Sequence, residues 1–76
     1  LSRTILSGAQ LSNAKLMGAN LSDADLTGAK LVDANLSNAN LTGANFHMAD
    51  LTGANLEGVI ISETNLSCIG HEICTS

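Results

Sequence analysis

Leucine recurs at every fifth position of this chain, and that spacing constrains the fold more than any other feature. Every Leu of the sequence falls in one register, which one Phe and one Ile share. The members are Leu1, Leu6, Leu11, Leu16, Leu21, Leu26, Leu31, Leu36, Leu41, Phe46, Leu51, Leu56, Ile61 and Leu66. We call each member of this register the centre of a unit. Every Ala, from Ala9 to Ala54, lies two positions before a centre. The chain is therefore an internal repeat of five-residue units.

A period of five fits neither the 3.6 residues of an α-helical turn nor the alternation of a β-strand. A helix would spread the Leu centres around its whole circumference. A chain that turns a corner in each unit can instead point Leu and Ala inward and the other three residues outward. Two positions after most centres comes Gly, Asn or Asp, and these residue types tolerate positive φ or cap a tight turn. The pattern predicts a coil with a repeating inner wall.

Units such as ANLSD, ADLTG, ANLSN and ANLTG resemble the A(D/N)LXX signature of pentapeptide repeat proteins, and the match runs through fourteen units from Leu1 to Leu66. The resemblance implies an all-β fold, a right-handed quadrilateral β-helix with four units per coil. On that basis we expect about three and a half coils with a short C-terminal cap. Residues 1–67 would form the pentapeptide-repeat β-helix, and residues 68–76 the C-terminal cap or tail.

If four units make a coil, residue n stacks on residue n + 20, and the core forms columns. The predicted core includes Leu6, Leu26, Phe46 and Leu66 in one column, Leu1, Leu21, Leu41 and Ile61 in another, and Ala24 and Ala44 beside them. We expect Phe46 to be a packing residue, because burial is the ordinary state of Phe, with its larger ring accommodated by local widening or by spare room in an adjacent coil.

Met48 stands where the other units have a turn-forming residue. We therefore predict a local change of turn type there.

The tail CIGHEICTS leaves the register after Leu66 and holds both cysteines of the chain. Cys68 and Cys74 are a candidate disulfide, which would suit an oxidising compartment, although two free thiols would suit a cytosolic protein. A third alternative joins Cys68, His71 and Cys74 as zinc ligands, with His47 as a fourth. Structural zinc usually has four clearly supplied ligands at commoner spacings, so we predict no metal site.

The sequence shows no catalytic constellation, and we predict neither an enzyme nor a cofactor. Asp23 and Asp25 look like paired carboxylates, but on this fold Asp23 sits at a corner and Asp25 belongs to a column of Asn and Asp. Turn chemistry and hydrogen bonding to the next coil explain both residues better. The Ser and Thr hydroxyls have no general base beside them.

The net charge of −4, from seven acidic and three basic residues, disfavours direct binding to nucleic acid or to an anionic membrane. No apolar run approaches the roughly 20 residues that span a bilayer. We predict a rigid, non-enzymatic solenoid that acts as a protein–protein interaction module or as a structural scaffold module. The alternative implied by the resemblance is a DNA-mimicking binder of a type II topoisomerase, but a cylinder of about 17 Å would need roughly ten acidic groups to match DNA. An ice-binding wall is disfavoured because the outward columns contain no continuous Thr ladder.

His47, Met48 and Ile60 are the candidate partner contacts, because they depart from the polar pattern of the outer positions. A homodimer through a solenoid end is a further expectation, since open ends invite association.

The chain begins with Leu, so we expect a processed chain or part of a longer one. The resemblance implies a bacterial source, with cyanobacteria included, or a plastid. The sequence does not choose between bacterial cytoplasm, periplasm and thylakoid lumen.

Overall fold

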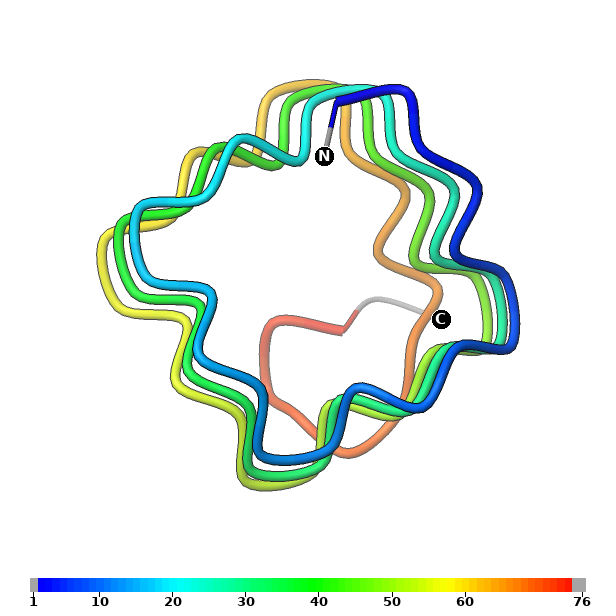
Figure 1. The fold of residues 1–76 in the computed structure, drawn as a ribbon, viewed down its shortest axis with the longest axis vertical. Helices are drawn as coiled ribbons and strands as arrows, with labels where there is room; N and C mark the ends of the chain where they lie inside the picture. The colour runs from blue at the N-terminus through cyan, green and yellow to red at the C-terminus, as the bar shows by residue number, and fades with distance from the viewer. Residues whose placement is uncertain (1, 75–76) are drawn as a thin grey trace.

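A computed structural model describes residues 2–74, and the chain winds as a four-sided coil whose successive turns lie in register on one another (Figure 1). Leu1, Thr75 and Ser76 lie outside the described residues. Residues 2–74 contain no helix and no β-strand longer than a single bridge. Each side of the coil contributes single parallel β-bridges. From the pair Ile5 and Asp25 to the pair Asn45 and Asn65, the bridged residues are twenty apart. The predicted stacking of residue n on residue n + 20 is confirmed.

The corners between Leu6 and Val59 are tight turns, each closed by one backbone hydrogen bond. The N–H of Ala24, for example, donates to the carbonyl of Leu21 at 3.1 Å, and equivalent bonds recur from Ala9 to Val59. The residue before each of these donors has positive φ, as at Asp23 (58°) and Gly28 (68°). A four-residue turn with positive φ at its third residue is type II. Gly, Asn and Asp are frequent there because they adopt this conformation with the least strain.

The predicted change of turn type at Met48 was wrong. Its φ is 60°, and the N–H of Ala49 still donates to the carbonyl of Phe46 at 2.9 Å. Neighbouring coils hold the corner on both sides, because the Met48 N–H bonds the Ser67 carbonyl at 2.7 Å and the His47 carbonyl accepts the Gly28 N–H at 2.8 Å. The repeating ladder therefore overrides the local preference of Met48.

The inward Leu and Ala side chains form one continuous core, and Phe46 lies in it with no exposed surface. Leu26, Ala24 and Ala44 are buried as predicted. Leu6 and Leu66 pack against this core but are only partly buried, because they lie near its ends.

Ile61 was predicted to belong to the core, but 44% of its surface is exposed. It continues the column of Leu21 and Leu41. The residues directly before these three, Asn20, Asn40 and Ile60, form successive β-bridges. No described residue continues this column beyond Ile61, because Ile60 forms no bridge with a later residue. The exposure of Ile61 thus follows from its place in the last part of the ladder.

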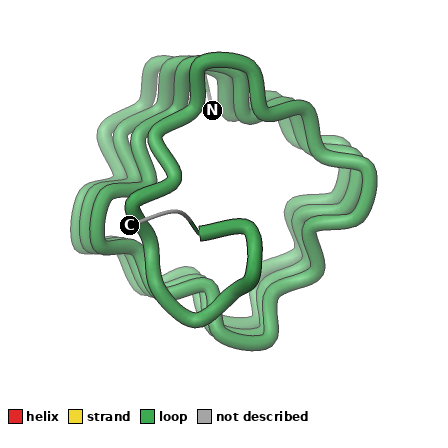
Figure 2. Tube along the Cα trace, turned by 180° about the vertical axis from the view of Figure 1, so that it is seen from behind, coloured by secondary structure: helices red, strands yellow, loops and turns green. Residues whose placement is uncertain are grey.

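After Leu66 the chain takes a corner that is one residue shorter. Asp50 pairs with Ile69 instead of with the residue twenty positions on, and the N–H of Leu51 donates to the Ile69 carbonyl at 2.8 Å. Cys68 stands in place of both the corner residue and the inward Ala, and it is buried. The following residues, red in Figure 1, fold back across the end of the coil, which Figure 2 shows from behind.

Gly70 lies where this segment crosses the corner formed by Asp50 and Thr52. Its φ is 86°, and an added Cβ would come within 2.8 Å of the Thr52 backbone nitrogen and would overlap the Thr52 hydroxyl. We expect Gly70→Ala to destabilise the protein more than Gly28→Ala. Gly28 also has positive φ (68°), but nothing lies within 4 Å of its added Cβ. Gly28→Ala should therefore lower the free energy of unfolding only by the left-handed strain of about 1–2 kcal/mol. Urea unfolding measures the difference, and equal losses would show that the crossing does not require glycine.

Candidate functional site

The described residues offer no metal centre and no membrane helix. Within residues 2–74, no three His, Cys, Asp or Glu side chains are grouped so that they could hold a metal ion. No helix in this part of the chain is long and apolar enough to cross a membrane. The features that stand out are the polar corners, the corner at His47 and Met48, which departs from the pattern in sequence but not in turn geometry, and the C-terminal segment.

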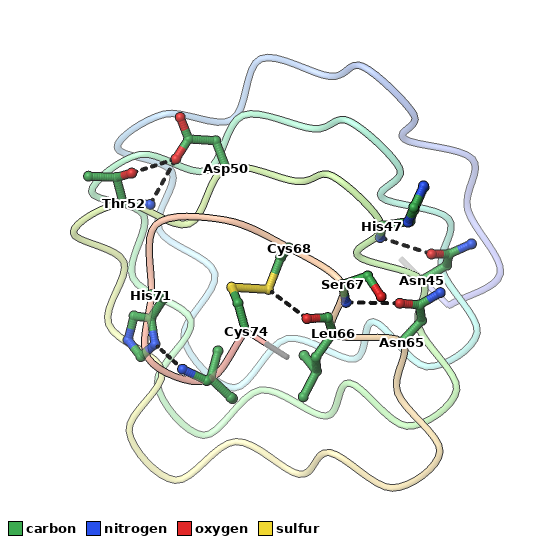
Figure 3. The surroundings of a disulfide bond; sticks show 11 residues. Asn45, His47, Asp50, Thr52, Asn65, Leu66, Ser67, Cys68, His71 and Cys74 are labelled. Carbon is green, nitrogen blue, oxygen red and sulfur yellow. Dashed lines mark hydrogen bonds between the residues drawn. A yellow bond between two sulfur atoms is a disulfide. The ribbon is translucent and has the colours of Figure 1, made fainter. Parts of the chain in front are cut away.

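At eight corners, an Asn or Asp side chain before the centre accepts the backbone N–H two residues later. The acceptors are Asn20, Asp25, Asn35, Asn40, Asn45, Asp50, Asn55 and Asn65. Figure 3 shows three of these bonds, from Thr52, His47 and Ser67. The prediction of turn chemistry for Asp25 is confirmed, but the bond lies within its own corner instead of reaching the next coil.

Two of these acceptors are carboxylates that also receive a hydroxyl hydrogen bond. The Thr27 hydroxyl donates to Asp25 at 2.7 Å, and the Thr52 hydroxyl donates to Asp50. These side-chain bonds, followed by the backbone N–H bonds from the same threonines, lower the pKa of both carboxyl groups. Lys30, on the coil next to Asp50, lowers the Asp50 pKa as its smallest cause. Each corner thus favours the charged acceptor by direct hydrogen bonding.

The candidate partner contacts do not form one patch. His47 and Met48 share a corner, where both are exposed, and Met48 shows 65% of its surface. Ile60 is 53% exposed but lies on another side of the coil, where it pairs with Asn40. Sequence reasoning missed the strong exposure of Ile5 (77%), although its place in an outward column with Asp25 could have revealed it.

The C-terminal segment contains the predicted disulfide between Cys68 and Cys74, which Figure 3 shows at the end of the coil. The two sulfurs are bonded to each other, so neither cysteine is a free thiol or can ligate zinc as a thiolate in this oxidised form. The alternatives of free thiols and of a zinc site were wrong for it. The ring of His71 instead accepts the N–H of Ile73 through Nδ1 at 3.0 Å. Cys74 and Ile73 are partly buried against the core.

Sequence reasoning missed the contact of Ile73 with the core. Ile73 lines a small apolar space together with Leu41, Phe46, Leu51, Leu56 and Leu66. Beside it, an open hollow of about 450 Å³ separates residues 54–57 from residues 71–73. The one available signal was an apolar residue directly before Cys74 in a polar tail.

The two hydrogen-bonded carboxylates predict an acid-sensitive fold. Because their folded-state pKa values are depressed, their stabilisation is present above the unfolded value of about 3.9 and is lost as pH falls through the folded value. We expect Asp25→Asn and Asp50→Asn to reduce the loss of stability between pH 6 and pH 2.5, since Asn keeps the acceptor without titrating. The reverse change, Asn40→Asp, should increase the loss, because Thr42 donates there in the same way. Urea midpoints at each pH measure both effects, and an unchanged pH profile in all three variants would contradict the assignment.

Comparison with known proteins agrees with this geometry. The family model described as pentapeptide repeats (8 copies) matches residues 1–31 and 19–58. A search of curated proteins found no significant match. The crystal structure of Rfr23, a pentapeptide repeat protein from the cyanobacterium Cyanothece 51142, is 35% identical, with 93% of this chain and 56% of that protein covered and a TM-score of 0.50. This chain thus spans little more than half the length of Rfr23.

A pentapeptide repeat protein from the Arabidopsis thaliana thylakoid lumen is 26% identical over 100% of this chain and 68% of that protein, with a TM-score of 0.48. HetL of Nostoc sp. strain PCC 7120, described as involved in heterocyst differentiation regulation, is 29% identical over 93% of this chain and 50% of that protein, with a TM-score of 0.29. The family model and Rfr23, together with the twenty-residue ladder, place the fold among right-handed β-helix solenoids. The chain belongs to the pentapeptide repeat family.

Proposed function

We propose that this chain is a rigid, non-enzymatic solenoid module that binds a protein partner through the corner at His47 and Met48. In this proposal residues 1–67 form about three and a half coils, residues 68–76 form the C-terminal cap, and neither nucleic acid nor membrane is bound directly. The observation that carries it is Met48, a long apolar side chain that is 65% exposed and held at positive φ.

The backbone conformation of Met48 is unfavourable for its residue type. A left-handed conformation costs about 1–2 kcal/mol in an L-residue other than Gly, Asn or Asp. Most corners avoid this cost by using Gly, Asn or Asp. Such strain persists where the surrounding structure enforces it, and it is concentrated at functional positions. An exposed Met gains little from the core, so its presence supports a role outside the solenoid.

The corner is also well suited to present side chains without further ordering. Ladder hydrogen bonds hold His47 and Met48 to the coils on either side, and the buried Phe46 directly precedes them. The His47 N–H is fixed to Asn45 Oδ1 at 2.9 Å. A partner that contacts this corner would therefore lose little free energy to ordering the backbone.

Among residues 2–74, the arrangement of acidic residues does not favour the topoisomerase alternative. DNA mimicry needs negative charge at regular spacing along the surface. In the corner columns, Asp23 is followed by Gly43 and Asp33 by Gly53. The acidic residues therefore do not continue from coil to coil.

Met48→Gly separates binding from stability. We expect it to raise the free energy of unfolding by about 1 kcal/mol, because glycine adopts positive φ without strain, and to abolish capture of the partner. The immobilised chain would be compared with Met48→Gly and with Met17→Ser, a control that alters another exposed Met (53%). Quantitative mass spectrometry would compare proteins retained from an extract of the source organism.

A protein retained by the wild type and by Met17→Ser, but lost with Met48→Gly, would support the proposal. An identical set of retained proteins in all three samples would overturn it. Urea unfolding of the same variants establishes that a loss of capture does not result from unfolding.

A further inference from the structure

We propose that the Cys68–Cys74 disulfide is a redox latch, and that its reduction releases residues 70–74 and uncovers an apolar surface at the end of the solenoid. The inference goes beyond the proposed binding corner and does not depend on Met48. It rests on what the C-terminal segment covers and on how few bonds hold it there.

The segment covers the open end of the core. Ile73 lies against an apolar space that is otherwise lined by Leu41, Phe46, Leu51, Leu56 and Leu66. These five residues supply the inner walls of the last coils, and the ladder ends at Leu56 and Leu66, since neither Asn55 nor Asn65 forms a described bridge with a later residue. Ile73 therefore acts as a plug, and its removal would expose the end of a column that includes the fully buried Phe46.

Few hydrogen bonds hold the plug to the coil. The described backbone bonds between segment and coil are both at Ile69, whose N–H donates to Ala49 at 2.9 Å and whose carbonyl accepts from Leu51 at 2.8 Å. Beyond Ile69 the bonds are internal, from the Cys74 N–H to the His71 carbonyl and from the Ile73 N–H to the His71 ring.

The neighbouring wall supports the plug only in part, because the open hollow of about 450 Å³ lies between residues 54–57 and residues 71–73. The disulfide from Cys74 to Cys68 is thus the main restraint on residues 70–74. Cys68 itself is fixed, since it is 3% exposed and packed in the core. One end of the latch belongs to the solenoid and the other end to the plug.

The reductant in this proposal is a dithiol, such as dithiothreitol. Its thiolate attacks the sulfur of Cys74, the less buried of the two residues, and forms a mixed disulfide while Cys68 leaves as a thiolate and takes up a proton. The second thiol of the reductant then displaces Cys74, which also becomes a thiol, and the reductant leaves as a disulfide. The Cys68 sulfur lies 3.4 Å from the Leu66 carbonyl oxygen (Figure 3), which can accept a hydrogen bond from the new thiol.

The test follows hydrogen exchange and binding of an apolar fluorescent dye, on the full chain with and without dithiothreitol. We expect reduction to speed exchange at the Ile73 and Cys74 amides by about tenfold or more and to raise dye fluorescence. Amides within the solenoid, such as Phe46 and Asn45, should keep their protection. The double variant Cys68→Ser/Cys74→Ser should show the same behaviour without reductant.

The variant Ile73→Ser keeps the disulfide and removes the plug's side chain, so it should bind the dye before reduction and gain less on reduction than the wild type. Unchanged exchange at Ile73 and Cys74 after complete reduction would overturn the latch. Loss of protection throughout the solenoid would also overturn it, because the disulfide would then stabilise the whole fold. Light scattering of the reduced sample would show whether the uncovered end joins a second copy, in which case dye binding should fall as protein concentration rises.

Discussion

One backbone hydrogen bond, from an inward Ala or from Val59 to the carbonyl of the centre three residues before it, closes every corner between Leu6 and Val59 and sets the geometry of the solenoid. The residue directly before the donor has positive φ, which makes each of these turns type II. Each such bond contributes only about 1 kcal/mol, but it directs the next side of the coil. Because it recurs every five residues, it brings residues twenty apart into parallel bridges. Without these corners the leucines would have no common interior.

The sequence predicts most of the fold because the corners are local and repeated. Once each unit turns, the positions of Leu and Ala decide the core, and the columns of Leu26 with Phe46 and of Ala24 with Ala44 follow directly. The turn role of Asp25 was predicted, although its hydrogen bond lies within its own corner and not to the next coil. The hydrogen bonds that these Asn and Asp side chains accept from the residue two positions on also explain why Thr or Ser often follows, as at Asp25 and Thr27. Lys30 cannot accept such a bond, and Val32 follows it without a hydroxyl.

What the sequence could not predict depends on interactions beyond one unit. Ile61 keeps the register but loses the next coil, so the pattern alone could not predict its exposure. The corner at Cys68 is shorter by one residue, and only the pairing of Asp50 with Ile69 reveals that shift. The same shift carries Ile73 over the core. The exposure of Met48 and Ile60 was therefore predictable from their outward positions, but the contact of Ile73 with the core was not.

The columns of corner residues explain why Met48 can occupy a left-handed position at all. Gly43 and Gly58 lie above Asp23 and Asn38, whose side-chain oxygens fill the space that a Cβ would need. The column of Met48 differs, because Gly28 lies beneath it and has no side chain. An added Cβ at Gly28, above Gly8, would likewise meet nothing within 4 Å. Met48 therefore bears conformational strain without a steric clash, and this column is one in which a long outward side chain is compatible with the ladder.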